Sequence, residues 1–139
     1  MTFKWPVRVY YEDTDSGGVV YYANYLKFME RARTEWLRSL GLEQDRLLDE
    51  FGVIFAVHSL ALDYRAPARF NDALQVSVTP QNKGRASLGF RQQVLRDAGD
   101  NDRQLLLCEG QVKIACLDAR TLRPRPIPDS VYAEITCED

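Results

Sequence analysis

Three acidic residues stand directly before a pair of glycines in the segment EDTDSGGVVYYANYLKFMERAR, residues 12–33. The segment continues into apolar residues at helical spacing, so Asp13 and Asp15 precede a predicted helix N-terminus. Gly17 and Gly18 let the backbone approach a ligand closely, and free N–H groups at a helix start can stabilise a developing oxyanion. A carboxylate beside such groups can attack an acyl carbon or activate a water, which predicts hydrolysis of an activated acyl group.

The same residues also suit a purely structural role. Asp, Thr, Ser and Gly all favour turns, and a carboxylate ahead of a helix interacts favourably with the helix dipole. Residue types alone support the catalytic and the turn-forming interpretation of this loop equally. We expect Asp13 to shape the loop and Glu12 to be solvated.

The sequence lacks the residues that several other reaction classes need. His58 is the single histidine and lies inside an apolar strand pattern, and no G-x-S-x-G segment occurs, so a serine or cysteine hydrolase is not expected. Cys108, Cys116 and Cys137 lack C-x-x-C spacing, which argues against disulfides and a zinc site. The Gly-Gly pair lacks the further glycines of dinucleotide-binding and P-loop folds. We therefore predict no metal and no redox or phosphoryl-transfer chemistry.

Composition narrows the class of protein. A chain of 139 residues with 45% hydrophobic content fits one domain with a sizeable core. The net charge of −2 gives no basic excess for nucleic acid or anionic lipid. No stretch approaches the roughly 18 apolar residues of a membrane span, and the N-terminal residues do not resemble a signal peptide. We expect a cytoplasmic protein with no nucleic-acid partner and no membrane span.

The hydrophobic pattern predicts one long helix among five strands. Apolar residues alternate over residues 3–11, the pattern of a half-buried strand. They recur at spacings of three and four from Tyr25 to Leu40, which predicts a helix that Gly41 ends. A shorter helix is expected at 43–51 and a short terminal element at 129–135. The further strands are expected at 53–64, 74–79, 86–96 and 105–117.

Turn signals join these elements. NKGR at 82–85 predicts a hairpin and DAGDND at 97–102 another turn, while 118–128 is a loop with three prolines. This order fits an α+β fold in which an antiparallel sheet buries one face on a single helix. The strand at 53–64 is apolar on both faces, which predicts that a partner subunit covers what the helix does not.

Three segments resemble a known family. VRVYYEDTDSGGVVYYANYLKFMERARTEWLRSLG, YRAPARFND at 64–72 and RPRPIPDSV at 123–131 are similar to the 4-hydroxybenzoyl-CoA thioesterase family of hotdog-fold proteins, and most of all to its Tol-Pal-associated, YbgC-like acyl-CoA thioesterase branch. The resemblance implies a hotdog domain over residues 1–139, with a long helix wrapped by a five-stranded antiparallel sheet. It also implies homodimers and often homotetramers, with active sites between subunits.

The resemblance further implies residue roles. The second Asp of the D-x-D step corresponds to Asp15, as nucleophile or general base, and a backbone N–H at about Tyr22 polarises the thioester carbonyl. YbgC-like proteins usually carry histidine at the position of Tyr22, whereas this chain has tyrosine there and resembles the aroyl-CoA branch at that position. A phenol with a pKa of about 10 is a poor base at neutral pH, so the role of nucleophile or base is assigned to Asp15. Coenzyme A enters as part of the substrate, without a separate cofactor, and its phosphates are expected near Lys83 and Arg85.

The sequence thus predicts an enzyme that cleaves an acyl- or aroyl-CoA thioester to the free acid and CoA. Two alternatives stay open. A non-catalytic module that binds acyl thioesters or an acyl carrier protein is the stronger one. A hydratase acting on acyl thioesters is the weaker, because it needs a catalytic histidine and His58 lies in the wrong context.

Overall fold

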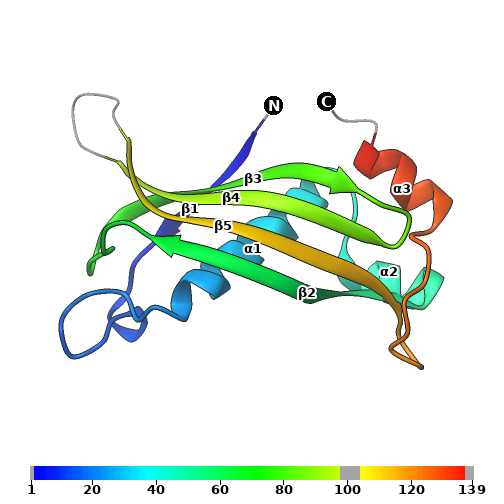
Figure 1. The fold of residues 1–139 in the computed structure, drawn as a ribbon, viewed down its shortest axis with the longest axis horizontal. Helices are drawn as coiled ribbons and strands as arrows, with labels where there is room; N and C mark the ends of the chain where they lie inside the picture. The colour runs from blue at the N-terminus through cyan, green and yellow to red at the C-terminus, as the bar shows by residue number, and fades with distance from the viewer. Residues whose placement is uncertain (1, 98–103, 137–139) are drawn as a thin grey trace.

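Five antiparallel strands wrap one long helix in the computed structural model of the chain, which describes residues 2–97 and 104–136 (Figure 1). The strand order across the sheet is β1-β3-β4-β5-β2. The predicted turn at 97–102 lies almost wholly outside the described residues. The elements are β1 (Phe3–Arg8), a 3-10 turn (Tyr11–Asp13), α1 (Asn24–Ser39), α2 (Gln44–Phe51), β2 (Val53–Tyr64), β3 (Ala73–Lys83), β4 (Ser87–Asp97), β5 (Gln104–Asp118) and α3 (Asp129–Thr136).

The long helix α1 forms where the apolar spacing predicts it. The sheet lies across α1 in Figure 1, and the buried residues of the helix recur every three or four positions. Trp36 meets the ring of Phe90 from β4 edge-on, with centroids 5.3 Å apart, an arrangement that aromatic pairs favour. Gly41 ends the helix with φ of 82°, a left-handed conformation that glycine adopts without steric cost. The predicted helix and its stop are confirmed.

One buried polar contact fastens α1 to the middle of the sheet. Gln92 of β4 is fully buried, and its Nε2 donates to the carbonyl oxygens of Met29 at 3.1 Å and Ser77 at 3.3 Å. Its Oε1 accepts a hydrogen bond from Arg33 of α1 at 2.9 Å. Desolvation lowers the pKa of the Arg33 guanidinium, because burial disfavours its charged form. Gln92 therefore satisfies a partly buried cation that a purely apolar sheet face would leave without an acceptor.

The hairpins and β5 also follow the sequence pattern. The amide of Gly84 donates to the carbonyl of Ser87 at 2.9 Å, which confirms the predicted β3–β4 hairpin. Alternate residues of β5 are buried from Cys108 to Cys116, as the period-2 pattern predicts. No helix among the described residues is long and apolar enough to cross a membrane.

The strand β1 is shorter than the predicted strand at 3–11. The chain leaves the sheet after Val9, which is fully buried, and enters the 3-10 turn. The carboxylate of Asp13 accepts a hydrogen bond from the amide of Tyr10 at 2.8 Å. This local bond competes with continued strand pairing. The prediction is therefore wrong beyond Arg8, and Tyr11, expected on the buried face, is 75% exposed.

The strand β2 forms a long, apolar edge of the sheet. It pairs with β5 on one side, and the register shifts once, at His58. Within the described part of the chain, no strand pairs with its other side. Natural edge strands are usually guarded by lysine, proline or short length, yet β2 has twelve residues and Asp63 as its single charged side chain. Its exposed large apolar residues are Val57 at 49%, Leu60 at 42% and Tyr64 at 49%.

The substitution Gln92→Ala is expected to lower the free energy of unfolding by about 1–3 kcal/mol, because it leaves the Arg33 guanidinium without its acceptor. Urea unfolding followed by circular dichroism measures the change. Gln111→Ala makes the same change on the exposed face of β5 and should cost less than about 0.5 kcal/mol. Equal losses for the two variants would contradict the role of Gln92.

Candidate active site

A tight loop carries Asp15 to the surface ahead of α1. The amide of Asp15 donates to the carbonyl of Val19 at 2.9 Å, and the amide of Gly18 donates back to the carbonyl of Asp15 at 3.0 Å. Gly18 has φ of 79°, which glycine adopts without strain. The Oδ1 atom of Asp15 accepts from the amide of Gly17 at 2.8 Å, as in an Asx-turn. Asp15 therefore does shape the turn, as one of the two interpretations of the sequence states.

The second carboxylate oxygen of Asp15 is available for chemistry. In the described ranges, 2–97 and 104–136, Oδ2 of Asp15 takes part in no hydrogen bond or ion pair, and the residue is exposed in the single chain. Water around an exposed carboxylate stabilises its charge and weakens electrostatic interactions with a bound substrate. The loop thus supplies a carboxylate oxygen that has no protein partner and is open to water in the single chain.

Asp13 ties the acidic loop to the start of α1. Its carboxylate binds the amide of Tyr10, as described above. Its carbonyl oxygen accepts two hydrogen bonds at 2.9 Å, one from the amide of Tyr21 and one from the side-chain Nδ2 of Asn24. The expectation that Asp13 shapes the loop is confirmed, and the loop is held against the first turn of the helix.

The start of α1 presents peptide N–H donors without protein acceptors. The amide of Asn24 donates to the carbonyl of Tyr21 at 2.8 Å, and the amide of Leu26 donates to that of Ala23 at 3.1 Å. In the part of the chain that the structure describes, the amides of Tyr22 and Ala23 donate to no protein atom. Such N–H groups carry the positive end of the helix dipole. The amide of Tyr22 is therefore free to bind an oxyanion, and its side chain is 63% exposed.

Aromatic side chains surround these donors. Tyr25 is buried, and its hydroxyl accepts from the amide of Ala68 at 3.0 Å. Tyr64, the last residue of β2, meets the ring of Tyr25 edge-on at 5.4 Å. Its hydroxyl donates to the carbonyl oxygen of Tyr22 at 3.0 Å. Desolvation raises the pKa of both Tyr25 and Tyr64, so both phenols stay protonated at neutral pH. In Figure 1 the arrowhead of β2 accordingly lies beside the loop that precedes α1.

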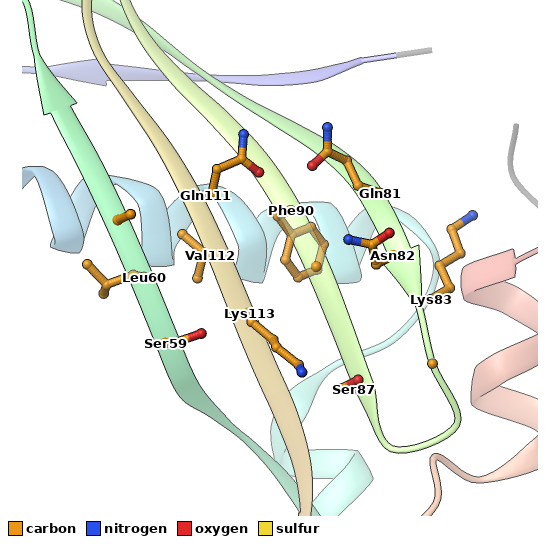
Figure 2. Close-up of a pocket in the computed structure, with 13 residues that line it drawn as sticks. Ser59, Leu60, Gln81, Asn82, Lys83, Ser87, Phe90, Gln111, Val112 and Lys113 are labelled. Carbon is orange, nitrogen blue, oxygen red and sulfur yellow. The ribbon is translucent and has the colours of Figure 1, made fainter.

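A groove of about 850 Å³ with polar and apolar lining residues crosses the outer face of the sheet (Figure 2). Gln111 and Lys113 of β5 line it and alternate with the buried residues that face α1, so the groove lies on the side away from the helix. The charged side chains that line it, Lys83 and Lys113, are both basic. The other polar side chains that line the groove are Ser59, Gln81, Asn82, Lys83 and Ser87.

The structure separates the two basic residues that the resemblance assigns to CoA phosphates. Lys83 lines the groove at the end of β3. Arg85 lies in the following turn, where its guanidinium carbon is 5.7 Å from the ring centroid of Tyr132 and its Nη2 is 3.8 Å from the carboxylate of Asp129. Lys113 joins Lys83 in the groove, and the sequence analysis missed it. The signal that could have found it is its outward position in the alternating pattern of β5. Neither Asp15 nor Tyr22 lines this groove.

The remaining candidate groups are not assembled into a site. Cys108 and Cys116 are free and buried, and desolvation raises the pKa of Cys108 to about 11, so its thiol is unreactive at neutral pH. His58 is exposed at the register shift of β2, and Cys137 lies outside the described residues. No group of three or more His, Cys, Asp or Glu side chains among the described residues is placed to hold a metal ion.

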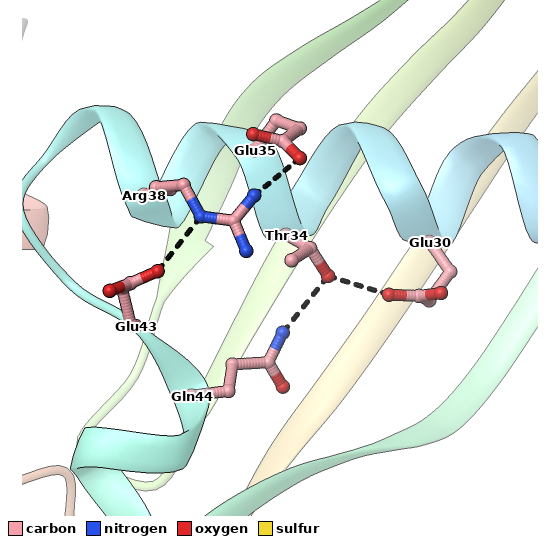
Figure 3. Close-up of polar contacts among 6 residues, drawn as sticks. All are labelled: Glu30, Thr34, Glu35, Arg38, Glu43 and Gln44. Atoms are coloured by element: carbon pink, nitrogen blue, oxygen red, sulfur yellow. Dashed lines mark hydrogen bonds and ion pairs between the residues drawn. The ribbon is translucent and has the colours of Figure 1, made fainter.

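Glu30, inside α1, belongs to an exposed polar network (Figure 3). It accepts a hydrogen bond from the hydroxyl of Thr34, which in turn accepts from Gln44 Nε2 at 3.0 Å. Arg38 completes the junction between α1 and α2 by pairing with Glu35 and with Glu43. Exposed pairs of this kind contribute little each. Glu30 thus serves the surface of the helix and does not contact the acidic loop.

Comparisons with known proteins cover nearly the whole chain. The thioesterase-like superfamily matches residues 9–135. The acyl-CoA thioester hydrolase YbgC of Escherichia coli O6:H1 is 44% identical over 132 residues, which are 95% of this chain and 94% of that protein. A hypothetical protein from Thermus thermophilus, known from its crystal structure, is 31% identical with a TM-score of 0.88, and the match covers 100% of this chain and 98% of that one.

The fold is also that of a solved 4-hydroxybenzoyl-CoA thioesterase. A variant of that enzyme, crystallised with 4-hydroxybenzoyl-CoA, superposes with a TM-score of 0.88 at 19% identity, over 96% of this chain and 97% of that one. The five-stranded antiparallel sheet around one long helix is therefore a hotdog fold, as the sequence predicts.

Proposed function

Because the chain belongs to the thioesterase-like superfamily, we propose that it hydrolyses acyl-CoA thioesters with Asp15 as the catalytic carboxylate. The family membership confirms the resemblance seen in the sequence, and the activity of YbgC supports the reaction class. One observation carries the choice of residues. The free oxygen of Asp15 and the free amide of Tyr22 belong to segments that Asp13 ties together.

The proposed reaction needs few groups. The amide of Tyr22 binds the thioester carbonyl oxygen and stabilises its negative charge as the tetrahedral intermediate forms. Asp15 either attacks the acyl carbon, so that the C–S bond breaks and water hydrolyses the mixed anhydride, or removes a proton from a water that attacks directly. The thiolate of CoA is a good leaving group, since thiols have a pKa of about 8.5. The phenol of Tyr22 is not required as an acid or base.

We propose that a second copy of the chain excludes water from this site by pairing along β2. The strand is long, apolar and open on one side, and a two-fold axis brings the same edge of two copies together in antiparallel pairing. The bond between Tyr64 and the carbonyl of Tyr22 places the end of β2 beside the peptide donors. A strand added to this edge therefore lies next to Tyr22. Such dimers can pair further into homotetramers.

Coenzyme A is proposed to place its phosphates in the basic groove and to enter only as part of the substrate. The groove borders β2 at Ser59 and Leu60, and the site borders β2 at Tyr64. Four residues of a strand span about 13 Å, and the pantetheine arm of CoA separates the thioester from the phosphates. We assign phosphate contacts to Lys83 and Lys113 inside the groove. Arg85 adds an exposed guanidinium in the adjoining turn.

A non-catalytic binding module remains the second candidate function. The observation that favours it is the exposure of Asp15 in the single chain, together with the turn bond of its Oδ1. Such a module would bind acyl-CoA or an acyl carrier protein and release no thiol. Binding by calorimetry without thiol release, across a panel of acyl groups, would favour it over the thioesterase.

The substitution Asp15→Asn is expected to lower kcat by at least about 100-fold, because it removes the nucleophile or base. The measurement is free-thiol release from a panel of acyl-CoA and aroyl-CoA substrates. Asp45→Asn, at an exposed position of α2, serves as the control and should keep wild-type turnover. Undiminished turnover by the Asp15 variant would remove this residue from the mechanism.

The wild-type chain of 16.0 kDa is expected to run as a dimer or tetramer in size-exclusion chromatography with light scattering. Val57→Lys puts a charge on the proposed pairing edge and should release monomers whose turnover is at least about 10-fold lower, since water then reaches Asp15. Leu48→Lys, on the exposed part of α2, should leave assembly and turnover unchanged. A fully active wild-type monomer would contradict the proposed pairing.

The substitution Lys113→Ala is expected to raise KM for acyl-CoA roughly 2- to 5-fold, the effect of an exposed charge pair worth up to about 1 kcal/mol. The value of kcat should stay within about twofold, because Lys113 does not approach the reacting carbon. Steady-state kinetics at low and high salt measure both constants, and the rise should shrink at high salt. Lys27→Ala on α1 is the control. An unchanged KM at low salt would argue against phosphate binding in the groove.

A further inference from the structure

We infer that Tyr64 is a positioning residue that orients the Ala23 amide as a second oxyanion donor beside the amide of Tyr22, an inference that rests on the proposed function. Its hydroxyl reaches the carbonyl oxygen of Tyr22 from the last residue of β2, at 3.0 Å. That carbonyl lies outside the regular hydrogen bonding of the helix, because the amide of Leu26 bonds to Ala23 instead. Tyr64 therefore caps an oxygen that α1 leaves without a helical partner.

Fixing a carbonyl also fixes the amide on the same peptide plane. In a trans peptide the C=O and N–H bonds are coplanar and point in opposite directions. The bond from Tyr64 to the carbonyl of Tyr22 therefore sets the direction of the Ala23 amide. In the preceding peptide, the bond from the Asn24 amide to the carbonyl of Tyr21 sets the direction of the Tyr22 amide. The amides of Tyr22 and Ala23 are thus held in direction by hydrogen bonds to the carbonyl oxygens of their own peptide planes.

The same hydrogen bond also strengthens the donor. A carbonyl that accepts a hydrogen bond polarises its peptide, and the amide of that peptide becomes a better donor by roughly 10–30% per bond. In the absence of Tyr64, water around the exposed Tyr22 would satisfy the carbonyl without fixing its direction. The specific gain from Tyr64 is therefore orientation, which is the property that an oxyanion site requires before the reaction begins.

The hydroxyl of Tyr64 is itself held in place. Its ring packs edge-on against Tyr25 at 5.4 Å and an interplanar angle of 75°. Tyr25 is buried, and the amide of Ala68 donates to its hydroxyl at 3.0 Å. Tyr64 also ends the strand on which we propose that two copies pair. The direction of the Ala23 amide is thereby coupled to the order of β2.

The substitution Tyr64→Phe tests this role, because it keeps the ring against Tyr25 and removes only the hydroxyl. We expect kcat to fall roughly 5- to 50-fold, less than the 100- to 1,000-fold loss that follows removal of a direct oxyanion donor. KM should stay within about twofold. The fall should be the same for every acyl group in the panel, because the thioester carbonyl is common to all of them.

Tyr11→Phe is the matched control, since the hydroxyl of Tyr11 makes no hydrogen bond to any described residue and the side chain is exposed. Its kcat should equal that of the wild type. Light scattering and thermal melting of both variants are measured in parallel. A fall in kcat that accompanies loss of assembly or of fold would assign Tyr64 to the interface and overturn the positioning role.

The possible outcomes distinguish a failure of the Tyr64 role from a failure of the proposed thioesterase function. One outcome overturns the role of Tyr64 alone: the wild type releases thiol, Asp15→Asn abolishes that release, and Tyr64→Phe is as active as the wild type. A rise in KM at constant kcat, or a fall that depends on the acyl group, overturns it as well. If the wild type releases no thiol from any acyl-CoA, the proposed function itself fails.

Discussion

The carbonyl oxygen of Asp13 is the point on which the proposed site depends. It accepts hydrogen bonds from the amide of Tyr21 and the side chain of Asn24, both at 2.9 Å. These two bonds fix the distance between a loop that carries a carboxylate and a helix start that carries free amides. A loop without them would move relative to the helix, and neither Asp15 nor Tyr22 would have a fixed partner across the substrate.

The single chain builds this geometry but leaves it exposed to water. The helix α1 packs against the sheet, and both the Oε1 and the Nε2 atom of the buried Gln92 make hydrogen bonds. The edge strand β2, by contrast, shows apolar side chains to solvent and reaches the site through Tyr64. The unpaired edge of β2 thus lies next to the exposed loop and helix start that form the proposed site. The proposed pairing along β2 would therefore cover the same region that has to exclude water from the proposed site.

The sequence predicts most of this fold because local pattern and tertiary packing agree. The 3.6-residue period of α1 and the alternation in β5 survive in the structure, since both elements bury one face on the same core. The pattern fails beyond Arg8, where the bond from the Tyr10 amide to Asp13 turns the chain out of the sheet. It also cannot reveal the contact between Tyr64 and Tyr22, because 42 residues separate them and only the fold brings them together.

The account is tested most directly by a crystal structure of the Asp15→Asn variant with an acyl-CoA bound. It predicts two copies paired along β2, with the thioester carbonyl oxygen about 3 Å from the amide nitrogen of Tyr22 and the side chain of residue 15 against the acyl carbon. An acyl group bound away from the start of α1, or a side chain at position 15 directed into bulk solvent in the assembled protein, would contradict it.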